Sequence, residues 1–526
     1  MTTFDPEPPS TSDARSRRTV LRTVAGLACA GALAGCNDTS GASTDSPIPG
    51  GTGTDAPVST TTATPTPTVT APPTGTQMPT PDSTGTPAST ATPTPSSTPA
   101  GRETAREFVA RLRAGEFDAA HSLFGDTLAS RMPRPTLERY WLGLTAQHGA
   151  VESVGSVESG TRDGSETLVV PVECAERRQR IELGVDGDGA LSGLWFPAEY
   201  SSPEYVDESA FAERTLTLEP GGCSLPATLS VPAGDDGGST ATATAGTKTA
   251  TVTDVGDTVP GVVLVHGSGQ HDRDGTIQPN EPYRDLAQGL ASRGVAVLRY
   301  DKRTHACDVP REEWAIDDII VDDAVHALGV LRDQPEVDPD RTVVAGHSIG
   351  ATCVPRIAER DGSVAGGALL AGNARPFTEV YPEQVKHLLE VQGGLSAREE
   401  RQLSAVKRLM SAVEDGSVAD DRQIGPVPGI WWKTLSEYDQ VATANRVDAP
   451  LFVAHGGRDF QIPIDPALSG WREGLDDPDT HRFERYPDLS HLFHSGTEPS
   501  LTTEYVFPDN VEEALVADLA EWVTGL

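Results

Sequence analysis

A serine between two glycines is the residue best suited to chemistry in this sequence. It lies in the stretch VVAGHSIGATC, residues 343–353, where Ser348 has Gly346 and Gly350 two positions away on either side. A nucleophilic serine on a sharp strand-to-helix turn needs an unfavourable backbone conformation, which is tolerated only if these two neighbours lack side chains. Glycine-rich bends also contain ordinary serines. Whether Ser348 is a nucleophile or an ordinary turn residue therefore depends on the elements predicted on either side of it.

Strand-like and helical patterns alternate around this serine from residue 259 onward. The runs GVVLVHG, VAVLRYD, RTVVAGHS and GALLAGN are typical of strands, and stretches such as YRDLAQGLASRG and DDAVHALGVLRDQ between them are typical of helices. This alternation predicts an α/β fold with a mostly parallel sheet and helices on both of its faces. Ser348 then follows a strand and begins a helix, so we interpret it as a nucleophile.

A serine hydroxyl needs a base to remove its proton, and the base needs a carboxylate to orient it. The apolar run APLFVAHGGRDF places Asp459 directly after a strand, and RYPDLSHLFH places His491 on a later loop. Asp465 and Asp439 are alternatives for the acid, but neither directly follows a buried strand. The sequence therefore predicts a catalytic triad of Ser348, Asp459 and His491.

The order Ser, Asp, His resembles that of the α/β-hydrolase family across roughly residues 214–526. The runs HGSGQHDRDG and LRYDKRT are similar to its dienelactone-hydrolase-like and serine-aminopeptidase-like branch. The resemblance implies that the turn in VLVHGSGQ is an oxyanion loop, with the backbone amides of Ser268 and Ile349 as donors. The remaining histidines near the motifs are expected to be structural or solvated: His266, His347, His481 and His494. The run YDKR, residues 300–303, is expected to form a packed ion pair.

The cap that such hydrolases carry over the sheet is expected at residues 376–446, within a hydrolase domain spanning 204–526. Ser396 and Glu399 form a capping-box pattern before a long amphipathic helix. Trp431 and Trp432 follow in the same insertion, and either shape an acyl pocket or pack in the core.

The first hundred residues predict export and a tether. In residues 1–35, Arg17 and Arg18 precede a short, weakly apolar stretch that ends at Cys36, which resembles a twin-arginine signal peptide with a lipobox. Cys36 is then the lipid-modified first residue of the mature chain, facing the cell exterior. Residues 36–100 are almost wholly Thr, Pro, Ser, Gly and Ala, which predicts a disordered stalk.

Residues 101–203 predict a small α+β domain, because a helical pattern precedes alternating strand-like runs. The region resembles the domain of unknown function that precedes certain bacterial and archaeal hydrolases, with a cystatin-like cone as its implied fold. We see no catalytic constellation in it. A low-complexity insertion, GDDGGSTATATAGTKTATVTDVGD, follows the hairpin-like run ERTLTLEPGGCSLPATLSVPA and is expected to be a surface loop.

The composition of the chain limits the kinds of partner that the protein is expected to bind. The chain has 77 acidic residues against 41 Lys and Arg, a formal charge of -36, which argues against nucleic acid as a partner. We interpret this charge as adaptation to high salt, with an ordinary acidic protein as the alternative. Four cysteines remain beyond Cys36, and Cys307 with Cys353 is one pairing that their positions suggest; buried free thiols are the other reading: Cys174, Cys223, Cys307 and Cys353. Their spacing predicts no metal site.

The sequence as a whole predicts an exported, lipid-anchored serine hydrolase that cleaves carboxylic esters through an acyl-serine intermediate. A small-molecule acyl compound is the expected substrate, and no cofactor is implied. A peptidase or thioesterase on the same triad is the nearest alternative, because a fold does not fix the leaving group. A non-catalytic surface module on a stalk is the alternative from another class of protein.

Overall fold

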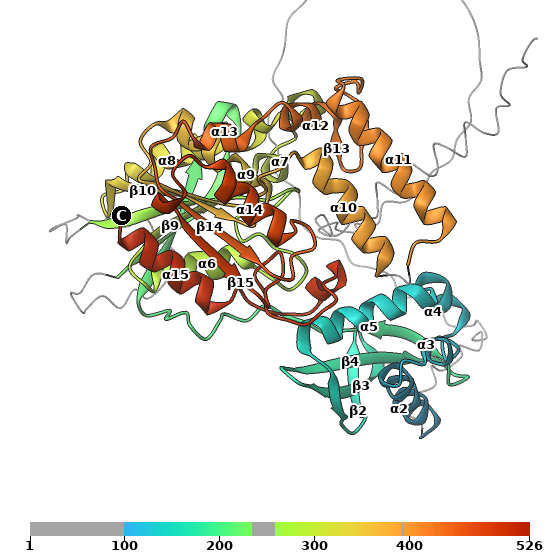
Figure 1. Cartoon of the computed structure of the whole chain (residues 1–526). Helices are drawn as coiled ribbons and strands as arrows, with labels where there is room; N and C mark the ends of the chain where they lie inside the picture. The colour runs from blue at the N-terminus through green and yellow to red at the C-terminus, as the bar shows by residue number, and fades with distance from the viewer. Residues whose placement is uncertain (1–98, 234–257, 392–393) are drawn as a thin grey trace, which may run out of the picture. The chain divides into compact units, whose positions relative to one another are not determined.

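The computed structural model describes residues 99–233, 258–391 and 394–526. The predicted signal peptide, nearly all of the predicted stalk and the low-complexity insertion lie outside the described residues. All described residues belong to one compact unit. They form a small N-terminal part and a larger α/β part (Figure 1).

The N-terminal part consists of helices followed by an antiparallel sheet, the order that the sequence predicts. Its elements are α2 (Pro99–Arg113), α3 (Phe117–His121), α4 (Asp126–Arg131), α5 (Arg134–His148), β1 (Val151–Val154), β2 (Glu158–Arg162), β3 (Ser165–Cys174), β4 (Arg178–Val185) and β5 (Leu191–Trp195). Alternate residues of β3, such as Leu168 and Val170, are buried in one cluster with Phe108 and Leu112 of α2. The likeness to a cystatin-like cone stays a prediction.

The larger part contains an eight-stranded, mostly parallel sheet. Its strands are β6 (Phe211–Leu218), β7 (Leu225–Pro232), β8 (Val259–Val265), β9 (Ala296–Tyr300), β10 (Val337–His347), β11 (Gly366–Leu370), β14 (Leu451–Gly456) and β15 (Arg482–Tyr486). They lie in the order β15-β14-β11-β10-β8-β9-β7-β6, and the pairs β6–β7 and β7–β9 are antiparallel while the others are parallel. The predicted α/β fold with a mostly parallel sheet is confirmed.

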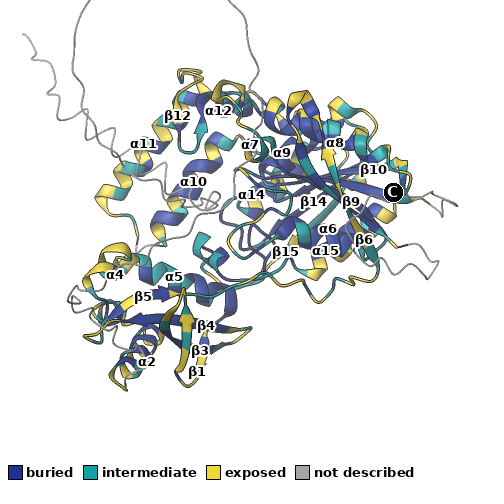
Figure 2. Ribbon diagram, turned by 180° about the vertical axis from the view of Figure 1, so that it is seen from behind, coloured by how far each residue is buried: buried dark blue, intermediate teal, exposed yellow. Residues whose placement is uncertain are grey.

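The central strands are apolar on both faces because helices cover both faces of the sheet. In β8, Val262 and Leu264 pack in a cluster with α6 (Pro282–Ala291) and α15 (Glu513–Thr524). Val263 and Val265 point the other way, into a cluster with α8 (Asp322–Arg332) and α9 (Ile349–Asp361). Figure 2 shows most of the central strands of this sheet in the buried colour, and exposed residues on the outer sides of the helices.

The strand order reverses at β8, which lies between β9 and β10. The connection from β8 leads to β9 on one side, and the connection from β9 returns past β8 to β10 on the other. Loops at the carboxyl ends of β8 and β10 therefore diverge and leave a crevice between them. Ligands bind at such switch points in open α/β sheets.

The segment between β11 and β14 is largely helical. It contains α10 (Phe377–Glu390), α11 (Ala397–Glu414), β12 (Gln423–Ile424), β13 (Val427–Pro428), α12 (Gly429–Ser436) and α13 (Gln440–Ala444). The Ser396 hydroxyl oxygen accepts the Glu399 amide, and the Glu399 carboxylate accepts the Ser396 amide, so the predicted capping box at the start of α11 is confirmed. Trp431 and Trp432 are buried, and their rings contact Phe377 in α10. Two further α-helices of the larger part are α7 (Arg303–Ala306) and α14 (Ile464–Gly474).

The chain beyond the sheet packs on α5 through residues 495–509. A Cβ atom on Gly143 would lie 2.6 Å from the carbonyl group of Thr503, so only glycine permits this approach. The Gln147 amide donates to the Ser495 carbonyl at 2.8 Å. Phe507 belongs to the same hydrophobic cluster as the N-terminal helices. The N-terminal part and the C-terminal chain thus share apolar core within the one compact unit.

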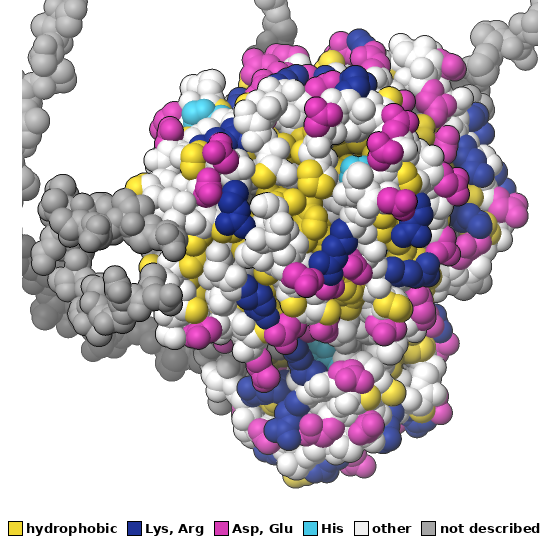
Figure 3. Space-filling model, turned by 60° about the vertical axis from the view of Figure 1, so that its left-hand side comes forward, with side chains coloured by type: hydrophobic (Ala, Val, Ile, Leu, Met, Phe, Trp, Pro, Cys, Tyr) yellow, Lys and Arg dark blue, Asp and Glu magenta, His cyan; other side chains and the backbone are white. Residues whose placement is uncertain are grey.

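The described surface is rich in charge of both signs. Acidic side chains are scattered over the face seen in Figure 3, between Lys and Arg side chains, rather than gathered in one patch. Arginine pairs such as Arg332 with Asp361, at 2.7 Å, offset part of the acidity. Within the described ranges, no helix has both the length and the apolar character that a membrane span requires.

A disulfide joins Cys223, after the β6 strand, to Cys307 at the end of α7. Cys174 and Cys353 are buried free thiols. A pairing of Cys307 with Cys353 is therefore wrong, because the hairpin of β6 and β7 brings Cys223 to Cys307 instead, a contact between segments 84 residues apart in sequence.

Replacing both Cys223 and Cys307 with serine should lower the free energy of unfolding by about 2–4 kcal/mol, because the bridge restricts the unfolded chain. Urea unfolding with and without a thiol reductant measures the effect. The reductant should destabilise the parent protein and leave the double variant unchanged. Equal stability of the two proteins without reductant would contradict the bridge.

Candidate active site

Ser348 directly follows β10 and is the N-cap residue of α9. Its backbone has φ 57° and ψ −120°, a strained conformation for a residue with a side chain. A Cβ atom on Gly346 would overlap the backbone of Gly350, and one on Gly350 would lie 2.5 Å from the carbonyl oxygen of His266. The strand-to-helix turn thus has the close backbone contacts that the two glycines predict.

Asp459 and His491 come together from the ends of two neighbouring strands, β14 and β15. The Nδ1 atom of His491 lies 2.7 Å from Oδ2 of Asp459, and both side chains are buried. The other carboxylate oxygen accepts hydrogen bonds from the amides of Gln461 and Ile462, each at 2.8 Å. Because a carboxylate only accepts, Nδ1 carries the hydrogen, and Nε2 of His491 is left as the basic nitrogen.

The two alternatives for the acid, Asp465 and Asp439, bind other partners. Asp465 forms an exposed ion pair with Arg485 at 2.6 Å. Asp439 caps α13 by accepting the amide of Ala442 at 2.9 Å. Neither faces His491.

The other histidines that lie near the sequence motifs are buried or bound to backbone. His481 accepts the Leu451 amide at 3.0 Å through Nδ1. Burial lowers the pKa of His494 to about 3, and that of His266 well below its usual value. These imidazoles are neutral at physiological pH and act as packing groups, as the sequence predicts.

One pocket contains both Ser348 and His491, with about 870 Å³ of empty space that opens to solvent. Its walls are mainly aromatic and aliphatic, and most of these side chains come from the segment between β11 and β14: Phe377, Tyr381, Val427, Trp431 and Trp432. Its polar side chains are those of serine, histidine, glutamine and tyrosine. Among the residues that line this pocket, none is Asp, Glu, Lys or Arg. The tryptophans thus both pack in the core and shape the pocket.

The predicted oxyanion donors lie on the two backbone segments next to the serine. Ser268 lines the pocket, and a Cβ atom on neighbouring Gly267 would lie 3.3 Å from Cβ of Ser348. Ile349 is the first residue of α9, so its amide has no carbonyl one turn earlier to bind. An incoming carbonyl oxygen at Ser348 would meet amides from both segments, helped by the positive end of the helix dipole.

A chain of hydrogen bonds that the sequence did not reveal links the oxyanion loop to the histidine loop. The Gly267 amide donates to the Tyr283 hydroxyl at 2.8 Å, and that hydroxyl lies 3.2 Å from Nδ1 of His347. Nε2 of His347 lies 2.8 Å from the carbonyl of His491. Burial lowers the pKa of His347 well below its usual value, so the ring is neutral, donates from Nε2 and accepts at Nδ1. Tyr283 lies in α6, where the pattern of the sequence indicates only that its side chain is on the buried face of the helix.

The chain is similar in sequence to known proteins. A family model described as serine aminopeptidase, S33, matches residues 258–498. Esterase EstD of Thermotoga maritima is 28% identical over 420 residues, which cover 79% of this chain and 93% of the esterase. An alignment of that length includes residues of the N-terminal part as well as the hydrolase part.

Similar solved structures include Est1E from Butyrivibrio proteoclasticus, at 14% identity over 59% of this chain and 99% of that one, with a TM-score of 0.38. Acylaminoacyl peptidase from Pyrococcus horikoshii is 14% identical, with a TM-score of 0.37, over 70% of this chain and about half (55%) of the peptidase. The fold assignment rests on the strand order and the family match. Residues 258–498, which carry most of the sheet and the candidate site, are therefore similar to the serine aminopeptidase, S33, family, and the larger part has the α/β-hydrolase fold.

Proposed function

We propose that this esterase-like hydrolase cleaves carboxylic esters of neutral, apolar compounds through an acyl-enzyme on Ser348. The observation that carries the proposal is the buried contact of Asp459 with Nδ1 of His491, in a pocket that His491 shares with a strained serine. The relative from Thermotoga maritima is named an esterase, which supports the same reaction class.

The chemistry proceeds in two halves. Nε2 of His491 takes the hydroxyl proton as Oγ of Ser348 attacks the ester carbonyl, and the amides of Ser268 and Ile349 stabilise the resulting oxyanion. The imidazolium, held by Asp459, then gives its proton to the leaving alkoxide, so an alcohol departs and an acyl-serine remains. Water attacks the acyl-serine with the same histidine as base, and the acid is released as Ser348 regains its proton.

The pocket favours esters over peptides with a free amino terminus. An aminopeptidase has to bind an ammonium group, which calls for a carboxylate near the nucleophile, and the lining residues include none. Gln384, Gln461 and Tyr505 offer only uncharged hydrogen bonds. Burying an unpaired charge there would cost several kcal/mol, on the order of the penalty for an isolated ion. The aromatic wall instead suits an apolar acyl or alkyl group.

Ser348→Ala should reduce hydrolysis of nitrophenyl butyrate by at least about 10³-fold, because the acyl-enzyme can no longer form. His491→Ala should cost about as much, and Asp459→Asn roughly one to two orders of magnitude less, since the acid only orients the base. Initial rates in high salt measure these losses, with circular dichroism as the check on folding. Asp465→Asn is the matched control and should keep the parent rate.

The same assay distinguishes the substrate classes. Amino-acid p-nitroanilides with a free amino group should be hydrolysed far more slowly than nitrophenyl butyrate by the parent protein. Robust aminopeptidase activity with negligible ester turnover would overturn the substrate class and keep the triad. Full ester activity in Ser348→Ala would overturn both.

We also propose that the protein is exported and held at the outer face of the membrane by a lipid on Cys36. Arg17, Arg18 and the residues before Cys36 support this through their likeness to an export signal and lipobox. The bridge between Cys223 and Cys307 adds support, because structural disulfides persist in oxidising compartments outside the cytosol.

Cys36→Ser should leave the protein unprocessed or shed into the medium, because no thiol remains to carry the lipid. Replacing Arg17 and Arg18 with lysine should retain the protein inside the cell. Cell fractionation with immunoblotting measures both outcomes. A Cys36→Ser protein that is normally processed and membrane-bound would refute the anchor.

The charge of -36 supports a third proposal, that the fold is adapted to high salt. Lowering the salt from molar to tens of millimolar lengthens the screening distance from about 3 Å to tens of ångströms, so carboxylates repel across the whole surface. We expect a lower melting temperature and loss of activity over this range. A melting curve that does not change with salt would exclude the adaptation.

A further inference from the structure

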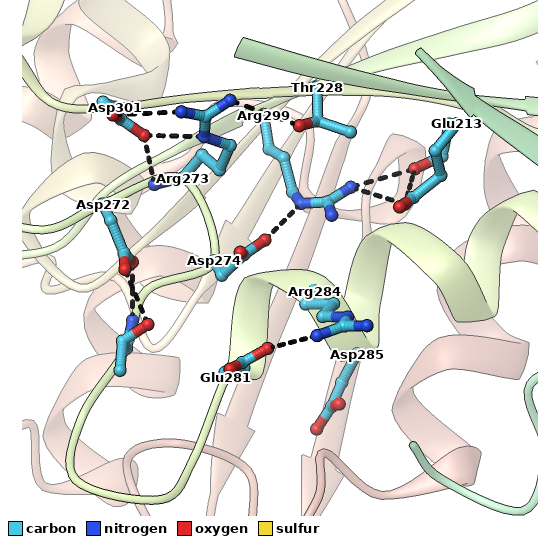
Figure 4. Close-up of polar contacts among 12 residues, drawn as sticks. Glu213, Thr228, Asp272, Arg273, Asp274, Glu281, Arg284, Asp285, Arg299 and Asp301 are labelled. Carbon is cyan, nitrogen blue, oxygen red and sulfur yellow. Dashed lines mark hydrogen bonds and ion pairs between the residues drawn. The ribbon is translucent and has the colours of Figure 1, made fainter. Parts of the chain in front are cut away.

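The loop that follows β8, residues 266–276, is fastened at its far end to the segment that follows β9, residues 301–304. The Asp301 carboxylate accepts hydrogen bonds from the backbone amide of Arg273 at 2.9 Å and from its guanidinium at 2.8 Å. Figure 4 shows this pair, together with Arg299 of β9 reaching the same loop. These contacts fix the far end of the loop and leave the turn at residues 267–269, beside Ser348, to be held by other groups.

That turn is intrinsically free to rotate. Gly267 and Gly269 flank Ser268, and Gly269 has φ 113°, a conformation open to glycine. Rotation of the peptide group between Gly267 and Ser268 would turn the Ser268 amide away from the pocket. An oxyanion donor is effective only if its direction is fixed before the reaction.

Lys302 supplies the missing contact. Its side chain is buried, at 4% exposure, and Nζ donates to the carbonyl oxygen of Gly267 at 2.7 Å. Within the described residues it forms no ion pair with a carboxylate, since Asp323 is engaged by Arg303 and Asp301 by Arg273. A buried cation on a single carbonyl is unfavourable for stability, so its presence points to a task other than folding.

Because the peptide group between Gly267 and Ser268 is planar, the contact of Lys302 with its carbonyl also sets the direction of its amide. In a trans peptide the C=O of Gly267 and the N–H of Ser268 lie in one plane and point in opposite directions. Ser268 lines the pocket and Lys302 does not, so holding the carbonyl on the lysine side turns the amide to the pocket side. His271 restrains the next peptide, with Nε2 at 2.6 Å from the Ser268 carbonyl.

We propose that Lys302 is a positioning residue of the oxyanion hole: its buried ammonium group holds the carbonyl of Gly267 and thereby aims the amide of Ser268 at the substrate carbonyl oxygen. Burial lowers the pKa of Lys302 to about 8, which leaves most of the group charged at neutral pH. The proposal rests on the proposed reaction at Ser348, and it assigns a role to the YDKR run beyond the packed ion pair that the sequence suggests.

The test compares Lys302→Met with Lys407→Met, which removes an exposed lysine of α11 as the matched control. We expect kcat for nitrophenyl butyrate to fall about 10- to 100-fold in Lys302→Met, a part of the loss seen when a whole oxyanion donor is removed. KM should stay within about twofold, since the ground-state carbonyl needs the donor less. The inhibition constant of a trifluoromethyl ketone, whose adduct places an alkoxide in the oxyanion hole, should rise by the same factor as kcat falls. Lys407→Met should match the parent protein in all three values.

A merely structural role predicts a different pattern, in which melting temperature, KM and kcat change while inhibitor affinity does not follow kcat. That pattern, or parent values of kcat and inhibitor affinity in Lys302→Met, would overturn the proposal. If Lys302→Met does not fold, Lys302→Gln takes its place, because its amide is one bond too short to reach Gly267; the same expected and contrary outcomes apply. Failure of the reaction at Ser348 is separate, since the parent protein would then hydrolyse no ester.

Discussion

The close approach of three backbone segments at the end of β10 is the constraint on which the site depends. The turn at Ser348 is so tight that a side chain at Gly346 or Gly350 would collide with neighbouring backbone. The same approach brings the end of β8 against the serine, so the predicted oxyanion donor Ser268 lies on a segment next to Ser348. The strain at φ 57° is maintained by the packed strands on either side, β8 and β11, which over-determine the position of β10.

Burial limits the number of side chains around the site that change protonation near neutral pH. His347 and His266 are kept neutral by burial, and the proposed acid–base pair is His491, which lines the pocket, with Asp459 bonded to its Nδ1 atom. Removing water from around such a pair strengthens its electrostatics, and the apolar walls do the same for the oxyanion hole. Lys302 is the exception, a buried cation placed behind the oxyanion loop rather than in the pocket.

Local patterns in the sequence predicted the fold, which the structure confirms, and the residues of the candidate triad. Apolar runs without alternation predict strands covered on both faces, and Ser348 and Asp459 each follow such a strand, while His491 follows the less apolar edge strand β15. Because these strands are parallel, the topology brings the three loops to one edge of the sheet. Three features depend on contacts between distant segments and could not be predicted: the bridge of Cys223 to Cys307, the packing of residues 495–509 on α5, and the hydrogen bond of Lys302 to Gly267. In each case the residue types occur at many places in the sequence, and only the tertiary structure shows which of them contact each other.

The central claim is that the turn at Ser348 carries an activated nucleophile. Incubating the folded protein with a fluorophosphonate probe, followed by proteolysis and mass spectrometry, tests it most directly, because the probe bonds only to a serine whose proton a neighbouring base removes. An activated Ser348 should take up one label per chain, and none after heat unfolding. A folded protein that takes up no label, or takes it up on a different serine, would show that Ser348 is not the nucleophile.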